Sequence, residues 1–233
     1  MLVDGSPIRK DLFQTGTEVQ FGPKTYTAWY NLRERMLREA TLDPNKQSYI
    51  RWEKFNKPPN IDRDVTNDMA GVLADVFAPF KPTHVLGIMN SGIDLAWTVA
   101  GRFRDDPPLL YPCIKTESPG SEREGPIVSA TSYTMGACYF ALPNLEEGSR
   151  VLLIDDTAAR GGASLPVIEG LLKQPGVSVA FGVGFDKEFQ GWQALLNQRY
   201  PQVRAFSVVR VEAINPAVNS ITLMHPHDAL RII

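Results

Sequence analysis

The chain has few of the features that mark a membrane, secreted or nucleic-acid-binding protein. It contains only two cysteines, and its formal net charge of −2 leaves no basic footprint for nucleic acid or an anionic membrane. No apolar run approaches the length of a membrane-spanning helix, and residues 1–16 lack the apolar core of a signal peptide. Cys113 and Cys138 have no metal-ligand spacing, so we expect reduced, structural thiols in a cytoplasmic protein.

The composition is otherwise that of an ordinary globular protein. Apolar residues make up 43% of the chain and charged residues 21%, which are usual values. A length of 233 residues allows one large domain, or one domain with an added lobe. The sequence has no internal repeats and no low-complexity linker. We therefore expect one compact domain.

The central part of the chain, residues 61–185, alternates helical and strand-like patterns. The predicted helices are 61–77, 94–103 and 163–173, and the predicted strands are 85–89, 109–114, 151–154 and 177–185. Strands separated by helices indicate βαβ units. The pattern therefore predicts an α/β fold with a parallel, twisted sheet and helices on both faces.

The regions outside this core have weaker patterns. Residues 1–60 are polar and irregular, apart from a predicted helix at 24–40. Residues 186–233 contain a predicted helix at 188–199 and two predicted short strands, 205–211 and 220–223.

The most informative segment is 151–163. It begins with four consecutive apolar residues, the pattern of a parallel strand buried on both faces. Asp155 and Asp156 follow where the predicted strand ends, and a Gly-Gly turn then opens a helix. Ligands of α/β sheets bind at the carboxyl ends of strands, and helix N-termini bind anions. An acidic pair beside an anion site suits a ligand with both hydroxyls and a phosphate, as in a sugar phosphate.

Two other interpretations of this segment are open. A phosphoacceptor receiver domain also begins with a strand ending in Asp-Asp, and its accepting aspartate lies two βα units downstream. Residues 195–211 contain no aspartate, which argues against that interpretation. The pair could also cap the following helix, although one cap does not require two adjacent carboxylates and the sequence Ala-Arg-Gly-Gly-Ala.

The acidic pair and the glycine turn together resemble the type I phosphoribosyltransferases. In that family such a segment binds 5-phosphoribosyl-1-diphosphate. The resemblance implies that Asp155 and Asp156 are the catalytic pair, and that the donor is bound by the turn residues Ala159, Arg160, Gly161, Gly162 and Ala163. The family usually has a hydroxyl residue at position 160 and often at 163, so we expect backbone N–H groups to make the phosphate contacts here.

A second strand end, before the predicted helix 94–103, carries Ser91 and Gly92. These small residues allow the backbone to approach an anion closely. Strand-to-helix turns also carry Gly and Ser for conformational reasons alone. The resemblance implies that this loop binds the pyrophosphate part of the donor.

Residues 115–126 form a segment rich in Glu, Ser, Gly and Pro, and the strand-like pieces 127–133 and 136–142 follow it. The resemblance implies a flexible hairpin that closes over the active site and excludes water from a cationic ribosyl intermediate. Lys115 and Arg123 are the candidate cations for the diphosphate. Lys115 stands at a strand end and is the better candidate, because Arg123 could equally belong to a solvated surface loop.

A third segment, Asp-Lys-Glu-Phe-Gln at 186–190, most resembles a Glu-Lys-Ser-Phe-Gln stretch of the xanthine phosphoribosyltransferases. The resemblance implies that Lys187 donates a hydrogen bond to an exocyclic oxygen of the base and that Phe189 lies near the base. It also implies a base-binding asparagine, either Asn56 or Asn60, with Asn56 preferred. Lys187 could instead be a surface lysine at a helix start.

The resemblance covers about residues 46–223. It implies a 61–185 core and a small hood built from 1–60 and 186–233. The implied reaction transfers ribose 5-phosphate to a purine base, with Mg²⁺ held by the acidic pair. Small molecules would be the partners, with no nucleic acid or membrane, and the enzyme would be a homodimer. The alternatives are a transferase for adenine or orotate, a donor-sensing regulator without activity, or an enzyme that makes an unusual nucleotide.

Overall fold

The computed structural model describes the residues 16–43, 46–52, 55, 62–104, 107–116, 118, 125–132 and 136–233. Its centre is an eight-stranded sheet in the order β10-β9-β8-β7-β3-β4-β6-β5. The strands are β3 (His84–Ile88), β4 (Leu109–Thr116), β5 (Ile127–Ser132), β6 (Gly136–Ala141), β7 (Arg150–Ala158), β8 (Ser178–Lys187), β9 (Arg204–Asn215) and β10 (Ser220–Leu223). Pairings among β4, β3, β7, β8 and β9 are parallel, whereas the two ends of the sheet are antiparallel.

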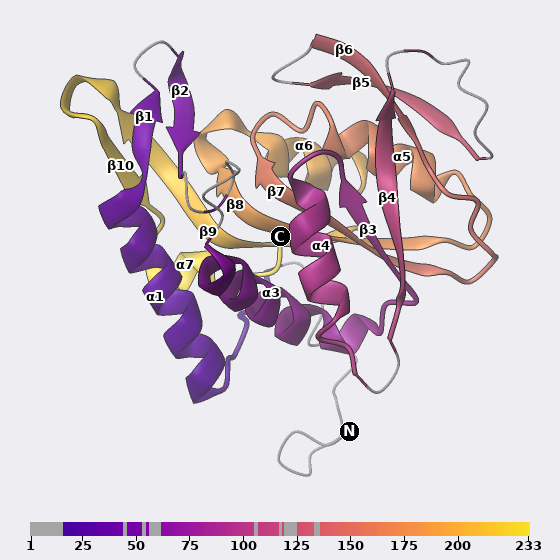
Figure 1. Ribbon diagram of the computed structural model, residues 1–233, viewed down its shortest axis with the longest axis horizontal. Helices are drawn as coiled ribbons and strands as arrows, with labels where there is room; N and C mark the ends of the chain where they lie inside the picture. Colours follow the sequence, from indigo (N-terminus) through magenta and orange to yellow (C-terminus); the bar gives the residue numbers. More distant parts are fainter. Residues whose placement is uncertain are drawn as a thin grey trace.

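The sheet is covered on both faces, as the sequence predicts (Figure 1). The helices α3 (Arg63–Phe77) and α4 (Gly92–Ala100) share one apolar cluster with Leu152 and Ile154 of β7. The helices α5 (Ser164–Leu172) and α6 (Trp192–Arg199) share the other cluster with Val151 and Leu153. Successive residues of a strand point to opposite faces, so four consecutive apolar residues are what a strand between two helical layers requires.

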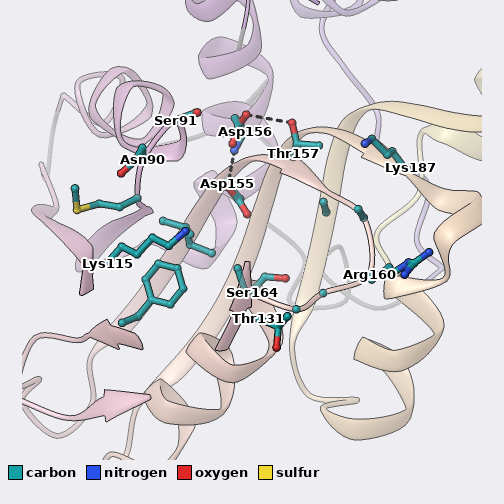
Figure 2. A pocket seen from close by; sticks show the side chains of 18 of the residues that line it. Asn90, Ser91, Lys115, Thr131, Asp155, Asp156, Thr157, Arg160, Ser164 and Lys187 are labelled. Atoms are coloured by element: carbon teal, nitrogen blue, oxygen red, sulfur yellow. Dashed lines mark hydrogen bonds between the residues drawn. The ribbon is translucent and has the colours of Figure 1, made fainter. Parts of the chain in front are cut away.

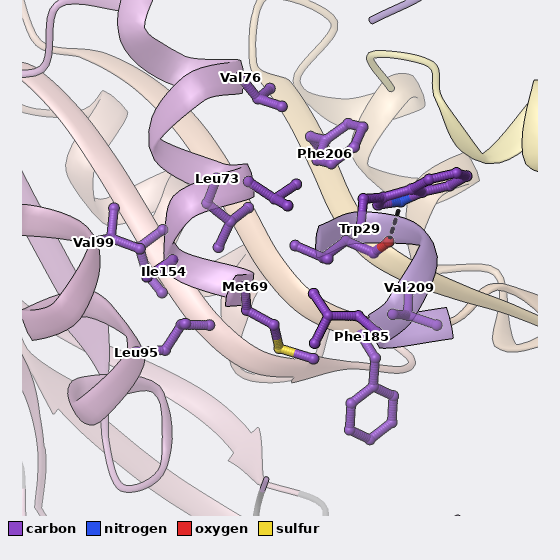
Figure 3. Close-up of a cluster of buried hydrophobic side chains, with 14 of the residues drawn as sticks. Trp29, Met69, Leu73, Val76, Leu95, Val99, Ile154, Phe185, Phe206 and Val209 are labelled. Atoms are coloured by element: carbon purple, nitrogen blue, oxygen red, sulfur yellow. Dashed lines mark hydrogen bonds between the residues drawn. The ribbon is translucent and has the colours of Figure 1, made fainter. Parts of the chain in front are cut away.

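The first helical layer is thickened by α1 (Pro23–Glu39), which packs outside α3 and β9. Figure 3 shows Met69, Leu73 and Val76 of α3 packed against the sheet, with Trp29 of α1 to their right. The indole N–H of Trp29 donates to the Val208 carbonyl at 2.8 Å. This bond satisfies the one polar group of a fully buried side chain and so fixes α1 on the sheet.

Several element boundaries differ from the sequence prediction. Helix α3 begins at Arg63, because the Asp62 side chain caps it by accepting from the Asp64 N–H at 2.9 Å. Strand β7 continues past Ile154 to Ala158, so the acidic pair lies within the strand. The predicted helix 188–199 is interrupted at Gly191, whose φ of +79° separates a 3₁₀ turn, η3 (Glu188–Gln190), from α6.

The N-terminal region contains a hairpin where the sequence predicted irregular structure. Strands β1 (Thr41–Asp43) and β2 (Lys46–Arg51) pair with each other in a separate two-stranded sheet. The Leu42 N–H donates to the Asn219 side chain at 2.9 Å, which ties this hairpin to the loop before β10. Strands of three and six residues with mixed polarity carry too short a pattern to identify from sequence.

The remaining elements are short: η2 (Ala78–Phe80), η4 (Pro216–Val218) and α7 (Pro226–Ala229). Cys113 and Cys138 are both buried, free thiols, and burial raises the pKa of Cys113 well above its usual range. In the part of the chain that the structure describes, no helix has the length and hydropathy needed to cross a membrane.

Candidate active site

A cavity of about 540 Å³ lies at the carboxyl ends of β3, β7 and β8. The chain leaves β3 toward β4 in one direction and continues from β7 to β8 and β9 in the other. The gap between β3 and β7 is therefore the topological switch point of the sheet, where α/β folds bind their ligands. Lys115 lines the cavity near the carboxyl end of β4, at the same edge of the sheet. Other segments reach the cavity from outside the parallel strands: Tyr49 and Ile50 of β2, Thr131 of β5 and Phe140 of β6.

Asp155 and Asp156 line this cavity between Lys115 and Lys187 (Figure 2). The Asp156 N–H donates to Asp155 Oδ1 at 3.0 Å, and the Thr157 hydroxyl donates to Asp156 Oδ2 at 3.1 Å. Burial raises the pKa of both carboxyls, and the Asp156 charge raises that of Asp155 further. Hydroxyl donors or a cation beside the pair would therefore stabilise the charged form of both carboxyls.

Gly92 supports the acidic pair from below and does not itself line the cavity. A Cβ at this position would lie 3.1 Å from the Asp155 Cα and 3.2 Å from its Oδ1. The neighbouring residues Asn90 and Ser91 do line the cavity, beside a cis peptide bond between Met89 and Asn90. The predicted pyrophosphate loop thus lies directly against the carboxylates.

The turn 159–163 connects β7 to α5, and all five of its residues line the cavity. Gly161 has a φ of +73°, and its carbonyl accepts from the Leu165 N–H at 2.9 Å. Gly162 lies against strand β5. Its carbonyl accepts from the Thr131 N–H at 3.0 Å, and a Cβ on Gly162 would be 2.5 Å from the Thr131 backbone oxygen. Backbone contacts therefore hold the turn on both sides. In the first turn of α5, the Leu165 and Val167 N–H groups donate to the Gly161 and Ala163 carbonyls, and Pro166 has no N–H group. An anion at this position would therefore be bound by N–H groups of the turn and of Ser164.

The other end of the cavity is formed by Lys187, the last residue of β8. Its side chain is only 3% exposed, and burial lowers its pKa to about 8 against the opposing effect of the Asp156 charge. The Lys187 Nζ lies 5.1 Å from the centre of the Tyr49 ring. Phe189 is 40% exposed and does not line the cavity. Asn56, Asn60, Arg123 and most of the predicted flexible segment 115–126 lie outside the described residues.

A buried polar network holds the backbone on both sides of Lys187. The Arg210 guanidinium donates to Glu188 Oε1 at 3.0 Å, to Gln193 Oε1 at 2.6 Å and to the Asp228 carbonyl at 3.0 Å. Gln193 donates in turn to Asp186 Oδ2 at 2.5 Å. Burial raises the pKa of Asp186 to about 6. The network joins β8, η3, α6 and β9 and thereby fixes the position from which Lys187 enters the cavity.

Residues 51–209 match the phosphoribosyl transferase domain. The chain belongs to this family. Its members are pentosyltransferases, which transfer ribose phosphate to bases, and the central parallel sheet with helices on both faces is the fold that the family resemblance implies.

This phosphoribosyltransferase is similar to proteins named xanthine phosphoribosyltransferase. It is 25% identical to that of Clostridioides difficile over 187 residues, covering 79% of this chain and 95% of the relative. It is 30% identical to that of Bifidobacterium longum over 159 residues, covering 67% and 81%. Among solved structures, adenine phosphoribosyltransferases from Trypanosoma brucei and Saccharomyces cerevisiae superpose with TM-scores of 0.60 and 0.59. The T. brucei protein has 18% identity and covers 77% of this chain and 79% of its own, and the S. cerevisiae protein has 14% identity and covers 77% and 99%. At that identity the likeness shows the fold.

Sequence reasoning missed some residues of the phosphoribosyltransferase cavity. Ser164 directly follows the predicted turn and lines the cavity, and it carries a hydroxyl group, which positions 160 and 163 lack. Thr131 lies within a strand-like segment whose contact with the turn depends on how β5 pairs with β6. Tyr49 comes from the hairpin that the sequence did not predict. Only the last of these three had no sequence signal near it.

Proposed function

We propose that this phosphoribosyltransferase transfers ribose 5-phosphate from 5-phosphoribosyl-1-diphosphate to a ring nitrogen of xanthine or another 6-oxopurine. The observation that carries the proposal is a single cavity with a phosphate turn and an acidic pair at one end and a buried lysine at the other. The names of the relatives at 25–30% identity support a purine acceptor. In the reaction, the bond from C1′ to the diphosphate oxygen breaks, a bond from C1′ to the purine nitrogen forms, and pyrophosphate leaves.

The donor binds at the end of the cavity formed by the acidic pair and the turn 159–163. Backbone N–H groups of the turn and of Ser164, the first residue of α5, bind the 5′-phosphate, and Arg160 adds positive charge at the rim. Asp155 and Asp156 accept hydrogen bonds from the ribose hydroxyls. Ser91 and Lys115 bind the diphosphate from the opposite side. The protein then lowers the barrier by positioning and charge stabilisation, without a protein nucleophile.

The acidic pair also fits a Mg²⁺ ion. Asp155 is buried and Asp156 is half-buried, and a cation would stabilise the charged forms of both carboxyls, whose pKa values are raised. Mg²⁺ in such sites uses one or two carboxylates together with substrate oxygens. Asp155 and Asp156 would hold the ion, which would neutralise charge on the diphosphate as that group leaves.

Lys187 is the feature that selects the acceptor. An ammonium group has three donors and no acceptor, so it can bind the carbonyl oxygen of an oxopurine and cannot accept from the amino group of adenine. Because Lys187 is 3% exposed, water cannot replace a hydrogen bond that the bound base fails to accept from the ammonium. This favours xanthine, hypoxanthine or guanine over adenine. The structurally similar proteins are, by contrast, named adenine phosphoribosyltransferases.

The test is pyrophosphate release from the donor in the presence of Mg²⁺, measured with xanthine, hypoxanthine, guanine, adenine, orotate and no base. We expect release that depends on an oxopurine. Release with adenine or orotate alone would overturn the acceptor assignment. Donor binding without release under any condition would replace the enzyme with a donor-sensing regulator.

A further inference from the structure

We propose that Tyr49 determines the acceptor specificity of this site, because its ring holds the Lys187 ammonium and forms the wall on which a planar oxygen-bearing base lies. The proposal rests on the proposed function, whose acceptor end it completes. Tyr49 and Lys187 both line the cavity, and the Lys187 Nζ lies 5.1 Å from the centre of the Tyr49 ring. That distance is within the range of a cation–π contact.

The position of Tyr49 is fixed by the residues that follow it. Ile50 and Trp52 are 1% and 0% exposed and anchor β2 in the core. The Trp52 ring contacts Phe55 at 5.8 Å between centroids, and Phe55 contacts Phe185 of β8 at 6.2 Å. The contact between Phe55 and β8 is close, since a Cβ on Gly184 would lie 2.6 Å from the Phe55 ring. The segment carrying Tyr49 is therefore packed on the same strand that carries Lys187.

The hairpin is also anchored at its other strand. Arg51 Nη2 pairs with the Asp43 carboxylate at 2.5 Å across β1 and β2, and Leu42 is bonded to Asn219. Together with the aromatic contacts, these bonds hold the ring over the ammonium before any ligand binds. A lysine side chain has four rotatable bonds, so it loses much conformational entropy when its ammonium must occupy one position. A ring that holds the ammonium in place reduces that cost for the incoming base.

The two groups together define the chemistry of the acceptor. The Tyr49 ring offers an apolar face for a flat ring, with offset stacking as the favoured arrangement. The Lys187 ammonium, whose Nζ lies 5.1 Å from the ring centre, offers hydrogen-bond donors next to the ring. A planar ring with an exocyclic oxygen satisfies both groups, whereas a ring with an amino group at the same position satisfies only the stacking surface.

The experiment compares Tyr49→Phe, Tyr49→Leu and Tyr49→Met, with Tyr30→Leu as the matched control. Tyr30 is 44% exposed on α1 and does not line the cavity. We expect Tyr49→Leu and Tyr49→Met to raise the KM for the oxopurine about tenfold, which is within the range of a partly desolvated cation–π contact. The KM for the donor should change by less than about twofold, and Tyr49→Phe and Tyr30→Leu should resemble the unmodified protein.

Binding of inosine 5′-monophosphate and adenosine 5′-monophosphate separates this proposal from the proposed function. If the unmodified protein binds inosine 5′-monophosphate but transfers nothing, the proposed function fails, and a loss of that binding in Tyr49→Leu, rescued in Tyr49→Phe, still supports the role of Tyr49. If Tyr49→Leu keeps normal oxopurine KM and nucleotide binding, the role of Tyr49 is wrong while the proposed function stands. Xanthosine 5′-monophosphate is measured alongside, and binding of none of the three nucleotides by the unmodified protein would overturn both. Tyr49→Met, which fills the same space with a flexible side chain, provides the result if Tyr49→Leu does not fold cooperatively.

Discussion

The donor end and the acceptor end of the cavity are built in different ways. The donor end is formed mainly by consecutive residues, from the last part of β7 through the turn 159–163, and its groups are backbone N–H groups and two adjacent carboxylates. The acceptor end brings together two residues that are far apart in the sequence, Tyr49 of the β1–β2 hairpin and Lys187 at the end of β8. Local sequence therefore specifies the donor end, whereas tertiary packing specifies the acceptor end.

The two ends also carry side chains of opposite charge, and their pKa values are shifted in opposite directions. Burial raises the pKa of Asp155 and Asp156 and lowers that of Lys187. Each shift disfavours the charged form that binding requires, so the free enzyme holds these charges at a cost. Substrate groups that pair with them recover that cost. Damage at one end should therefore change the affinity for one substrate and leave the other nearly unchanged.

The largest effect is expected from Asp155→Asn combined with Asp156→Asn. The double variant should lose transfer by about 10³-fold or more, because preorganised groups of this kind contribute about 10²–10³-fold each. The amides remove two carboxyls whose charged forms are disfavoured by burial, so unfolding in urea should remain cooperative. Near-normal pyrophosphate release with any base would contradict the role of the pair.

Arg210→Met should weaken the acceptor end through the network behind it. The change leaves Asp186 buried without its nearest cation and releases Glu188 and Gln193. We expect the free energy of unfolding to fall by about 3–5 kcal/mol, measured by urea denaturation. Arg38→Met on the exposed surface of α1 is the control and should change it by less than about 0.5 kcal/mol. Equal losses in the two variants would show that the network stabilises nothing.

Gly162→Ala should damage the donor end alone. The new Cβ would lie 2.5 Å from the Thr131 backbone oxygen, so the turn 159–163 must move away from β5. We expect the donor KM to rise about tenfold, because moving the turn shifts the N–H groups that bind the phosphate. The oxopurine KM should change little. The control Gly71→Ala on α3 has open space around it and should stabilise the protein by about 0.5–1 kcal/mol. A shared rise in both KM values would remove the separation of the two ends.

The smallest effect is a pH dependence confined to the acceptor. Loss of the Lys187 proton removes the positive charge and the charge-assisted hydrogen bond to the base, and burial lowers the pKa of this group to about 8. The oxopurine KM should therefore be constant below that value and rise as the pH increases above it, by about tenfold for each unit well above the pKa. The donor KM should not follow. The measurement uses an oxopurine whose own ionisation lies above this range, and a donor KM that rises in parallel would assign the titration elsewhere.

Much of the fold could be predicted from sequence because its signals are local. The four apolar residues before Asp155 indicated a strand covered on both faces, and β7 contacts both helical layers. The helix 188–199 was predicted as one piece, although Gly191 adopts a left-handed conformation that divides it. The hairpin β1–β2 was missed because its short strands have little periodicity.

The candidate site divides along the same line. The turn 159–163 and the acidic pair could be placed from sequence, because strand, carboxylates and glycines follow one another directly. Lys187 and Phe189 belong to one short motif, yet only Lys187 reaches the cavity, because η3 turns the chain between them. Tyr49 could not be predicted, since its place depends on the packing of Phe55 against β8.

The most direct test of this account is the pair of Michaelis constants of Lys187→Ala, measured with an oxopurine and with the ribosyl donor. We expect the oxopurine KM to rise by about 10²-fold or more, because a buried hydrogen-bonding site discriminates strongly against an unpaired partner. The donor KM should change by less than about threefold. An unchanged oxopurine KM, or equal rises in both constants, would contradict the assignment of Lys187 to the acceptor and with it the division of the cavity into two ends.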